Sequence, residues 1–234
     1  MSPPVRLLIH GATGRMGRAL LRLCREEGLG CTVVAAVARH APQETGVPGF
    51  AVAELDDVPD FDVAVDFSLP DGFDTVLALC LARRTALVSG TTGLSEGQQA
   101  ALDAAAARIP LVWASNYSLG VAVLQVLVSQ AAGLLHGWDC DIVESHHAHK
   151  KDAPSGTALT LGASAQTAGV VPHYASIRAG DIVGEHLVQF TGTGERIELI
   201  HRASSRDIFA RGALHAARRL HGREPGRYPF ENLV

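Results

Sequence analysis

The chain has few aromatic residues and no excess of positive charge. Only 5% of its 234 residues are Phe, Trp or Tyr, and its formal net charge is −4. Proteins that bind nucleic acid or an anionic membrane usually present a basic face, and single-stranded nucleic acid is commonly held by stacking on aromatic side chains. The composition therefore argues against nucleic acid and membranes as partners.

The cysteines are also few, and none belongs to the Cys-x-x-Cys pairs typical of structural zinc sites. They are Cys24, Cys31, Cys80 and Cys140. Each lies in an apolar run, which predicts small buried residues in a reducing compartment. No secretory signal is recognisable, and no uninterrupted apolar stretch reaches about 18 residues, the length of a membrane span. We expect a soluble, cytoplasmic protein.

The first half of the chain alternates apolar runs with helical patterns. The runs typical of buried strands cover residues 5–10, 32–37, 62–68, 86–90 and 111–115. Strands that alternate with helices predict a Rossmann-like, doubly wound parallel sheet, which binds ligands at the carboxyl ends of its strands. Polar segments follow these ends at residues 11–17, 38–40, 90–92 and 115–117. We expect them to line one edge of the sheet.

The second half has a different pattern. A long apolar helix is predicted over residues 119–135 and another helix from about Ser155. Residues 185–190 and 195–202 have strand composition and are joined by a hairpin-like Thr-Gly-Thr-Gly segment. In the second strand Ile197 and Leu199 alternate with charged residues, as in a sheet with one solvated face. We predict a smaller α+β domain with a mixed or antiparallel sheet, followed by a helix over residues 207–220.

A glycine-rich segment, GATGRMG, follows the first strand and opens the first helix. Its glycines are Gly11, Gly14 and Gly17, whereas the usual dinucleotide fingerprint would have glycine in place of Ala12. Small residues still let the backbone approach a pyrophosphate, and the helix N-terminus favours an anion. The alternative is an ordinary strand-to-helix turn. The strand before the segment and the helix after it favour the dinucleotide loop over this alternative.

The end of the second strand bears on the choice of cofactor. It reads Ala38, Arg39 and His40, with no carboxylate of the kind that NAD-selective sites use for the ribose diol. Arg39 is therefore a candidate ligand of a 2′-phosphate, and we hypothesise that NADPH serves at least as well as NADH. The alternative is that Arg39 and His40 are solvated loop residues.

The segment ESHHAHKKDAPSGTAL, residues 144–159, has the densest polar pattern in the chain. A metal site is disfavoured, because lysines would repel a cation; a solvated loop and an anion-substrate site stay open. For the anion site, lysines attract carboxylates, and histidine exchanges protons near neutral pH. The Pro-Ser-Gly-Thr turn predicts a helix start whose amides suit a carboxylate. A nucleotide loop together with such a site suggests a reductase.

This segment closely resembles the signature of the dihydrodipicolinate reductase family. Further matching blocks, in the same order, are GATGRMG, SGTTG (89–93), ASNYSLGV (114–121), RAGDIVGEH (178–186) and HRASSRDIFARGAL (201–214). The resemblance implies NAD(P)H-dependent reduction of 4-hydroxy-tetrahydrodipicolinate to tetrahydrodipicolinate, with loss of water, in lysine and diaminopimelate biosynthesis. It also implies a dinucleotide-binding domain at 1–117 completed by 207–234, a substrate-binding and oligomerisation domain at 118–206, and a homotetramer.

The resemblance assigns roles by matching positions. His146 is the implied proton donor and acceptor, and Lys150 the second proton donor. His147, Gly156 and Thr157 are the implied substrate contacts, the last two through their amides to a carboxylate. The implied cofactor residues are Gly11, Ala12, Thr13, Gly14, Arg15, Met16, Gly17, Arg39, Gly90, Thr91, Thr92, Ala114, Ser115, Asn116 and Tyr117. No metal is expected, because the lysines of the polar segment would repel a cation.

Three departures from the family pattern stand out. Ala38 replaces an acid present in many members, Tyr117 replaces a phenylalanine, and only about twenty residues, 159–177, separate the Pro-Ser-Gly-Thr helix from the RAGDIVGEH block. The chain therefore resembles a short form of the family. A nucleotide-binding sensor without catalysis, and a dehydrogenase of another small dicarboxylate, are the alternatives.

Overall fold

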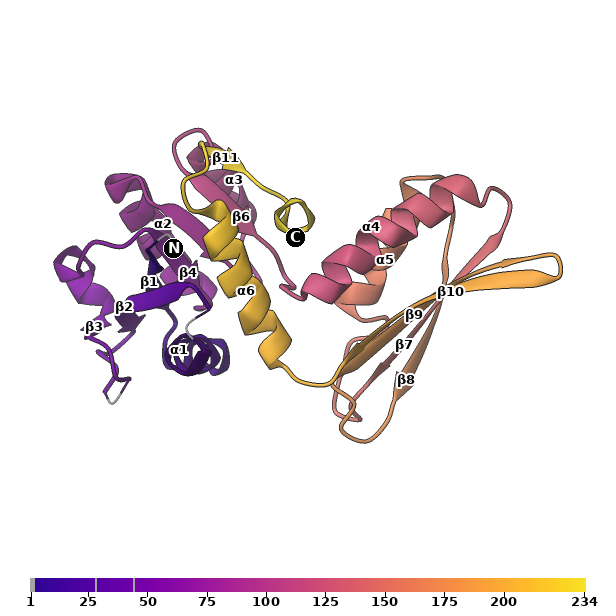
Figure 1. Cartoon of the computed structure of the whole chain (residues 1–234), viewed down its shortest axis with the longest axis horizontal. Helices are drawn as coiled ribbons and strands as arrows, with labels where there is room; N and C mark the ends of the chain where they lie inside the picture. The colour runs from indigo at the N-terminus through magenta and orange to yellow at the C-terminus, as the bar shows by residue number, and fades with distance from the viewer. Residues whose placement is uncertain (1–2, 28, 44) are drawn as a thin grey trace. The chain divides into compact units, whose positions relative to one another are not determined.

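The computed structural model describes residues 3–27, 29–43 and 45–234 and consists of two compact units (Figure 1). Unit 1 comprises Met1–Tyr117 and Phe209–Val234, and unit 2 comprises Ser118–Ile208. Each unit has a sheet and a hydrophobic core of its own.

Unit 1 is built on a seven-stranded sheet in which every strand pair is parallel. The strands are β1 (Val5–His10), β2 (Cys31–Ala38), β3 (Gly49–Ala51), β4 (Val63–Asp66), β5 (Ala86–Ser89), β6 (Pro110–Trp113) and β11 (Gly226–Arg227). Their order is β11-β6-β5-β4-β1-β2-β3. The central strands β4 and β5 are buried along their whole length, which explains why their sequences are continuous apolar runs rather than alternating ones.

The helices of unit 1 cover this sheet. They are α1 (Arg15–Glu27), α2 (Pro70–Arg83), α3 (Glu96–Ala105) and α6 (Asp207–Leu220), with short 3-10 helices η1 (Val52–Asp57) and η2 (Phe230–Leu233). Buried residues of α2 and α3 form one core cluster with residues of the strands. The helix α6 returns from the far end of the chain and pairs with α1 through Arg211 and Glu27, whose charged atoms are 2.6 Å apart. A capping box of Ser95 and Gln98 starts α3.

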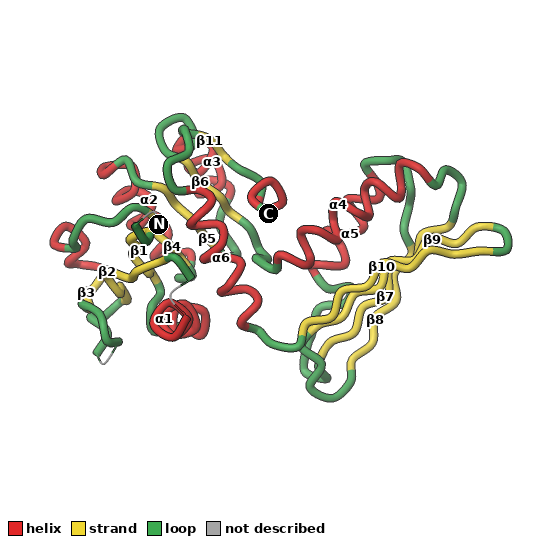
Figure 2. Tube along the Cα trace, in the orientation of Figure 1, coloured by secondary structure: helices red, strands yellow, loops and turns green. Residues whose placement is uncertain are grey.

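Unit 2 is a four-stranded mixed sheet with two helices packed on one face (Figure 2). Its elements are α4 (Leu119–Leu134), β7 (Asp139–His146), α5 (Gly156–Gln166), β8 (His173–Arg178), β9 (Gly184–Gly192) and β10 (Glu195–Ala203). The order is β10-β9-β7-β8; β9 is antiparallel to both β7 and β10, and β8 is parallel to β7. Along β7 and β9 every second side chain is buried beneath the helices.

The structure confirms the predicted fold class. The strands and helices expected from the sequence are present with small shifts at their ends, and all four cysteines are free and buried. The short strands β3, β8 and β11 were not predicted. The alternation expected in β10 is partly wrong, because Ile197 lies near the hairpin turn and 42% of its surface is exposed, whereas Leu199 packs against the core. No helix in the described part of the chain is long and apolar enough to cross a membrane.

Candidate functional site

The glycine loop of unit 1 connects β1 to α1 through close backbone approaches. The amides of Gly11 and Ala12 both donate to the carbonyl of Val37 on β2, each at 3.0 Å. Gly11 has a φ of +79°, which glycine adopts without strain. A Cβ atom at Gly17 would lie 2.3 Å from the carbonyl oxygen of Gly11, so glycine is needed for α1 to begin this close to the loop. The N-terminus of α1 is thereby held against the loop, an arrangement that suits a phosphate.

The predicted cofactor residues follow the carboxyl ends of β1, β2, β5 and β6. Because these strands are parallel, the four loops share one edge of the sheet. Exposed members of this set are Thr13, Gly14, Arg15, Arg39, Thr92 and Ser115; partly buried members are Gly11, Met16, Gly90, Ala114 and Asn116; buried members are Ala12, Gly17, Thr91 and Tyr117. The edge therefore offers both backbone amides and charged side chains to a ligand.

Buried side chains hold the loops after β5 and β6 in place. The indole Nε1 of Trp113 donates to the carbonyl of Thr91 at 2.8 Å, and the Thr91 hydroxyl donates to the buried carboxylate of Asp66 at 2.8 Å. The hydroxyl of Tyr117 donates to the carbonyl of Ser89 at 2.8 Å. Tyr117 is 1% exposed, so its side chain belongs to the core and only its backbone is available to a ligand.

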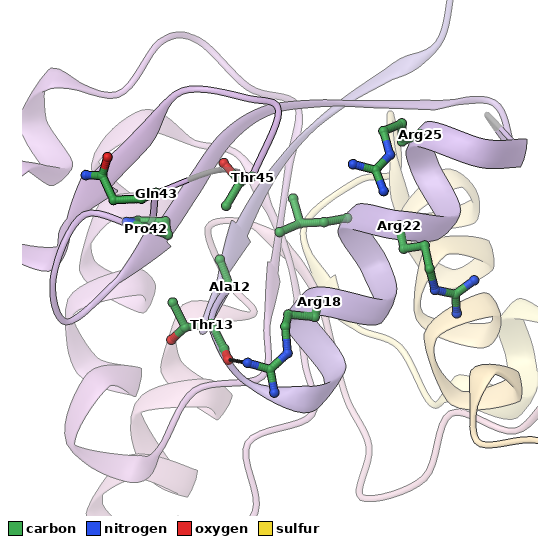
Figure 3. Close-up of a pocket in the computed structure, with 9 residues that line it drawn as sticks. Ala12, Thr13, Arg18, Arg22, Arg25, Pro42, Gln43 and Thr45 are labelled. Carbon is green, nitrogen blue, oxygen red and sulfur yellow. Dashed lines mark hydrogen bonds between the residues drawn. The ribbon is translucent and has the colours of Figure 1, made fainter.

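A pocket of about 350 Å³ adjoins the glycine loop (Figure 3). It is lined by Ala12, Thr13, Arg18, Leu21, Arg22, Arg25, Pro42, Gln43 and Thr45. Three of these are arginines from successive turns of α1; Arg18 donates to the carbonyl of Thr13 at 2.7 Å, and Arg22 pairs with Glu26 at 3.2 Å. The described residues that line the pocket include no carboxylate, so its charge favours an anion.

The candidate site of unit 2 is centred on a carboxylate and an imidazole at the end of β7. Glu144 and His146 are two residues apart on the strand, so both face the helix-covered side of the sheet. Glu144 is 0% exposed, and its Oε2 atom lies 2.5 Å from Nδ1 of His146. Arg178, on the neighbouring strand β8, donates to the two carboxylate oxygens at 2.6 and 2.9 Å. Burial alone would raise the pKa of Glu144, but the hydrogen bonds from Arg178 and its other partners outweigh burial and lower it to about 2.

Opposing effects of its surroundings act on the pKa of His146. Burial lowers its pKa, the hydrogen bond to Glu144 opposes that effect, and the charges of Lys150 and Arg178 lower the pKa further. The ring of His186, on β9, lies edge-on to that of His146, with centroids 5.2 Å apart. The net effect is a lowered pKa of His146, and negative charge that binds beside the ring would raise that pKa.

The loop from β7 to α5 carries Lys150 and the start of the helix. Nζ of Lys150 contacts both carboxylate oxygens of Asp152 at 2.8 Å, and this hydrogen bond lowers the pKa of Asp152. Ser155 is the N-cap of α5, which begins at Gly156. The amide of Ser155 donates to Oε1 of Glu144 at 3.2 Å, so one carboxylate ties the helix start to the end of β7.

The predicted substrate-side residues lie at the end of β7, in the loop after it and in the first turn of α5. Lys150 is near enough for its charge to act on His146, and Gly156 and Thr157 form the first turn of α5. His147 follows the last residue of β7, and its ring centroid lies 6.4 Å from that of His149. Among the residues that the structure describes, no group of three or more His, Cys, Asp or Glu side chains is arranged to hold a metal ion.

Family models match this chain almost from end to end. The model described as the N-terminus of dihydrodipicolinate reductase matches residues 5–117, and the model of its C-terminus matches residues 120–234. The chain belongs to the dihydrodipicolinate reductase family. The family predicted from the sequence blocks is thus confirmed, and so is the predicted activity, the NAD(P)H-dependent reduction of 4-hydroxy-tetrahydrodipicolinate in lysine biosynthesis.

Relatives of high identity carry the same activity in their names. The chain is 68% identical over 234 residues to the 4-hydroxy-tetrahydrodipicolinate reductase of Stenotrophomonas maltophilia (strain R551-3), covering 99% of this chain and 98% of the relative. It is 65% identical over 233 residues to that of Xanthomonas campestris pv. campestris (strain B100), with the same coverage. These relatives therefore share the short length of this chain.

Among solved structures, the dipicolinate-bound dihydrodipicolinate reductase of Paenisporosarcina sp. TG-14 has the same fold. The TM-score is 0.85 and the sequence identity 22%, covering 99% of this chain and 100% of that chain. The agreement extends over both units and confirms the predicted combination of a Rossmann-like sheet with a smaller mixed sheet.

Sequence reasoning missed several residues of this reductase that the structure places in the two sites. Glu144, Asp152, Ser155 and Arg178 form the network around His146 and Lys150, although all lie within the quoted blocks. Glu144 carried a usable signal, because residues two apart on a strand share a face. The arginines of α1 gave no sequence signal of a pocket, since surface arginines on a helix are ordinarily solvated.

Proposed function

We propose that the reduction takes place at the carboxyl end of β7, with His146 as the residue that exchanges a proton with the substrate. The observation that carries this proposal is the pairing of His146 with the buried carboxylate of Glu144, 2.5 Å away. An imidazole with one nitrogen fixed by a carboxylate has the other nitrogen available for general acid and base catalysis.

The groups around His146 suit a substrate with two carboxylates. Lys150 supplies a positive charge and a second proton donor, and the amides of Gly156 and Thr157 at the start of α5 suit one carboxylate. His147 is proposed as a further substrate contact. These groups neutralise the negative charge of the substrate and place its ring beside His146.

We propose that unit 1 is the dinucleotide-binding domain and unit 2 the substrate-binding domain. The positive φ of Gly11, the close approach at Gly17 and the N-terminus of α1 fit a pyrophosphate. The residues proposed to hold the dinucleotide are those of the loops after β1, β2, β5 and β6. Bound NAD(P)H supplies the hydride for ring carbon C4 of the substrate.

The charges near the glycine loop support NADPH as a cofactor at least as good as NADH. Arg39 is exposed at the end of β2, and the adjoining pocket contributes Arg18 and Arg25 without a carboxylate among its described lining. A 2′-phosphate would be attracted by these charges. The expected result is a kcat/KM with NADPH equal to or above that with NADH, and a selective loss with NADPH in Arg39→Ala.

The experiment that tests the function is a coupled assay. NADPH and NADH oxidation are followed with substrate made fresh from pyruvate and aspartate semialdehyde by the preceding synthase. Oxidation that depends on the synthase is expected, and His146→Gln should lower kcat about 100-fold or more while NADPH binding stays unchanged. Wild-type kcat in His146→Gln would exclude His146 as the proton donor. No oxidation with either cofactor, in protein shown to bind NADPH, would point to a sensor or to a dehydrogenase of another dicarboxylate.

We also propose that the chain forms a homotetramer through the sheet of unit 2. On the face opposite the two helices, the register of the strands aligns Ala175, Val143, Leu187 and Ile200 in one row across all four strands. Ile200 is 44% exposed there. An apolar row on a sheet face is a surface suited to a second sheet.

A further inference from the structure

The carboxylate of Glu144 has more partners than a structural ion pair with Arg178 needs. It accepts hydrogen bonds from two Arg178 nitrogens, from the amide of Ser155 and from Nδ1 of His146. Arg178 alone would compensate its charge, as bidentate pairs do. The contact with His146 therefore calls for an explanation of its own.

The hydrogen bond fixes which nitrogen of His146 carries a proton. An ionised carboxylate only accepts hydrogen bonds, so Nδ1 must be the donor. Nε2 is then the nitrogen free to gain and lose a proton. On that side of the ring lies Gly184 of β9, where a Cβ atom would come within 3.1 Å of Nε2. A glycine at this position keeps the side of Nε2 clear.

We propose that Glu144 is a positioning residue of the reduction: it holds the Nδ1–H of His146, orients the ring, and leaves Nε2 to deliver the proton. This rests on the proposed role of His146. After C4 has received the hydride, the substrate is an electron-rich enamine. The nucleophilic carbon of the enamine then forms a C–H bond as the Nε2–H bond of His146 breaks. The electron pair of the Nε2–H bond stays on Nε2. His146 becomes neutral with Nδ1–H still bonded to Glu144, and solvent restores the proton.

The charges that act on His146 come from its own strand, from β8 and from the following loop. Glu144 on its own strand favours the protonated ring, whereas Arg178 on β8 and Lys150 in the following loop oppose it. His186 on β9 contacts the ring but stays neutral, because burial and the charge of His146 lower its pKa to about 4. His201 on β10 pairs in register with His186 and has a pKa lowered by burial. Glu144 thus supplies the stabilising charge for the donor form.

Loss of the Glu144 charge should therefore change the pH dependence of the reaction. A proton donor works below its pKa, so kcat falls as the pH rises through the pKa of His146 in the complex. In Glu144→Gln that fall should move to lower pH by about one unit or more, since a neighbouring opposite charge shifts a pKa by about one to three units. At pH 7 and above, kcat drops at least about tenfold. The KM for NADPH is expected to stay unchanged.

The experiment combines pH profiles with histidine NMR. Profiles of kcat against pH are measured for the wild type, His146→Gln, Glu144→Gln, Glu144→Asp and Glu195→Gln. The matched control is Glu195→Gln, because Glu195 is an exposed residue of the same sheet at the β9–β10 turn. In parallel, 15N-labelled histidine spectra of the wild type identify the tautomer of neutral His146, assigned by comparison with His146→Gln. This second measurement does not require that the Glu144 variants fold.

The expected result is an Nδ1–H tautomer, a displaced profile in Glu144→Gln, partial recovery of the profile in Glu144→Asp and a wild-type profile in Glu195→Gln. An Nε2–H tautomer with unprotonated Nδ1 would overturn the proposal. So would a profile of Glu144→Gln that coincides with the wild type while His146→Gln is inactive. Full activity of His146→Gln would instead refute the proposed function on which the inference rests.

Discussion

Three histidines lie side by side on neighbouring strands of the unit 2 sheet, and their surroundings give them different chemistry. They are His146, His186 and His201, on β7, β9 and β10. Only the first shares a hydrogen bond with a carboxylate among the described residues, and Nδ1 of the other two is buried there without a hydrogen-bond partner. Charging either would bury an uncompensated cation. Of the three, His146 therefore has the surroundings that best suit the proton exchange proposed for it.

At the same scale, Tyr117 stands where a phenylalanine is usual in the ASNYSLGV block, and its hydroxyl has a structural role. Tyr117→Phe removes the hydrogen bond to the Ser89 carbonyl and leaves a buried acceptor with one partner fewer. The free energy of unfolding should fall by about 1 kcal/mol, with the affinity for NADPH nearly unchanged. Urea denaturation and cofactor titration measure the two effects.

The matched control is Tyr228→Phe, whose exposed hydroxyl donates to the carbonyl of Glu224 at 2.9 Å. Its loss should cost less than about 0.5 kcal/mol, because water replaces the partner. If Tyr117→Phe left stability unchanged but weakened NADPH binding, the hydroxyl would belong to the cofactor site and not to the core.

Sequence reasoning at the residue scale identified side chains with conspicuous chemistry but not their partners. His146 and Lys150 stand out in a polar block, and the resemblance gave them roles. Arg178 lies 34 residues beyond Glu144 and reaches it only because β8 pairs with β7. Partnerships of this kind depend on strand order, which the sequence of either strand alone does not specify.

At the scale of elements, the helices and strands predicted from the sequence are those with a clear hydrophobic period or a capping residue. The strand β8, HYASIR, was missed because it lies at the edge of the sheet and its side chains are mostly exposed, so its sequence does not alternate. The strands β3 and β11 are only 3 and 2 residues long, too short for any period to show. Yet β8 supplies Arg178, so the unpredicted strand completes the site.

The start of α5 yields a prediction about substrate affinity. The carboxylate of Asp152 lies on Nζ of Lys150, and its pKa is lowered by that hydrogen bond and also by the amide of Gly156. These are the groups proposed to hold a substrate carboxylate, so Asp152 competes with the substrate. Asp152→Asn should lower the KM for the dicarboxylate about two- to fivefold with little change in kcat, in keeping with an exposed ion pair.

Steady-state rates over a range of substrate concentrations measure this effect. Asp181→Asn, an exposed carboxylate in the loop between β8 and β9, is the control for a simple change in net charge. A raised KM in Asp152→Asn would show that Asp152 assists binding, and equal changes in both variants would assign the effect to long-range charge.

At the scale of the whole molecule, the chain consists of two units that differ in architecture. Unit 1 has a parallel sheet whose loops gather at one edge, and unit 2 has a mixed sheet with a polar cluster at one end of its helix-covered face. The chain leaves unit 1 after Tyr117 and re-enters it at Phe209. The return is held by contacts such as Arg211 with Glu27, which are remote in sequence and gave no local signal.

The uncovered face of the unit 2 sheet leads to the prediction about assembly. Ile200 lies in the apolar row of this face, so Ile200→Glu would place a charge where a second sheet is proposed to pack. Burying an unpaired carboxylate is costly, and the assembly should dissociate into smaller species. Light scattering after size exclusion should give four chains of 24.6 kDa for the wild type and a lower mass for the variant.

The control is Val126→Glu on α4, with a similar exposure of 43% but on the helical side of unit 2. It should keep the wild-type mass. A wild-type mass for Ile200→Glu, or dissociation by Val126→Glu alone, would place the interface on another surface.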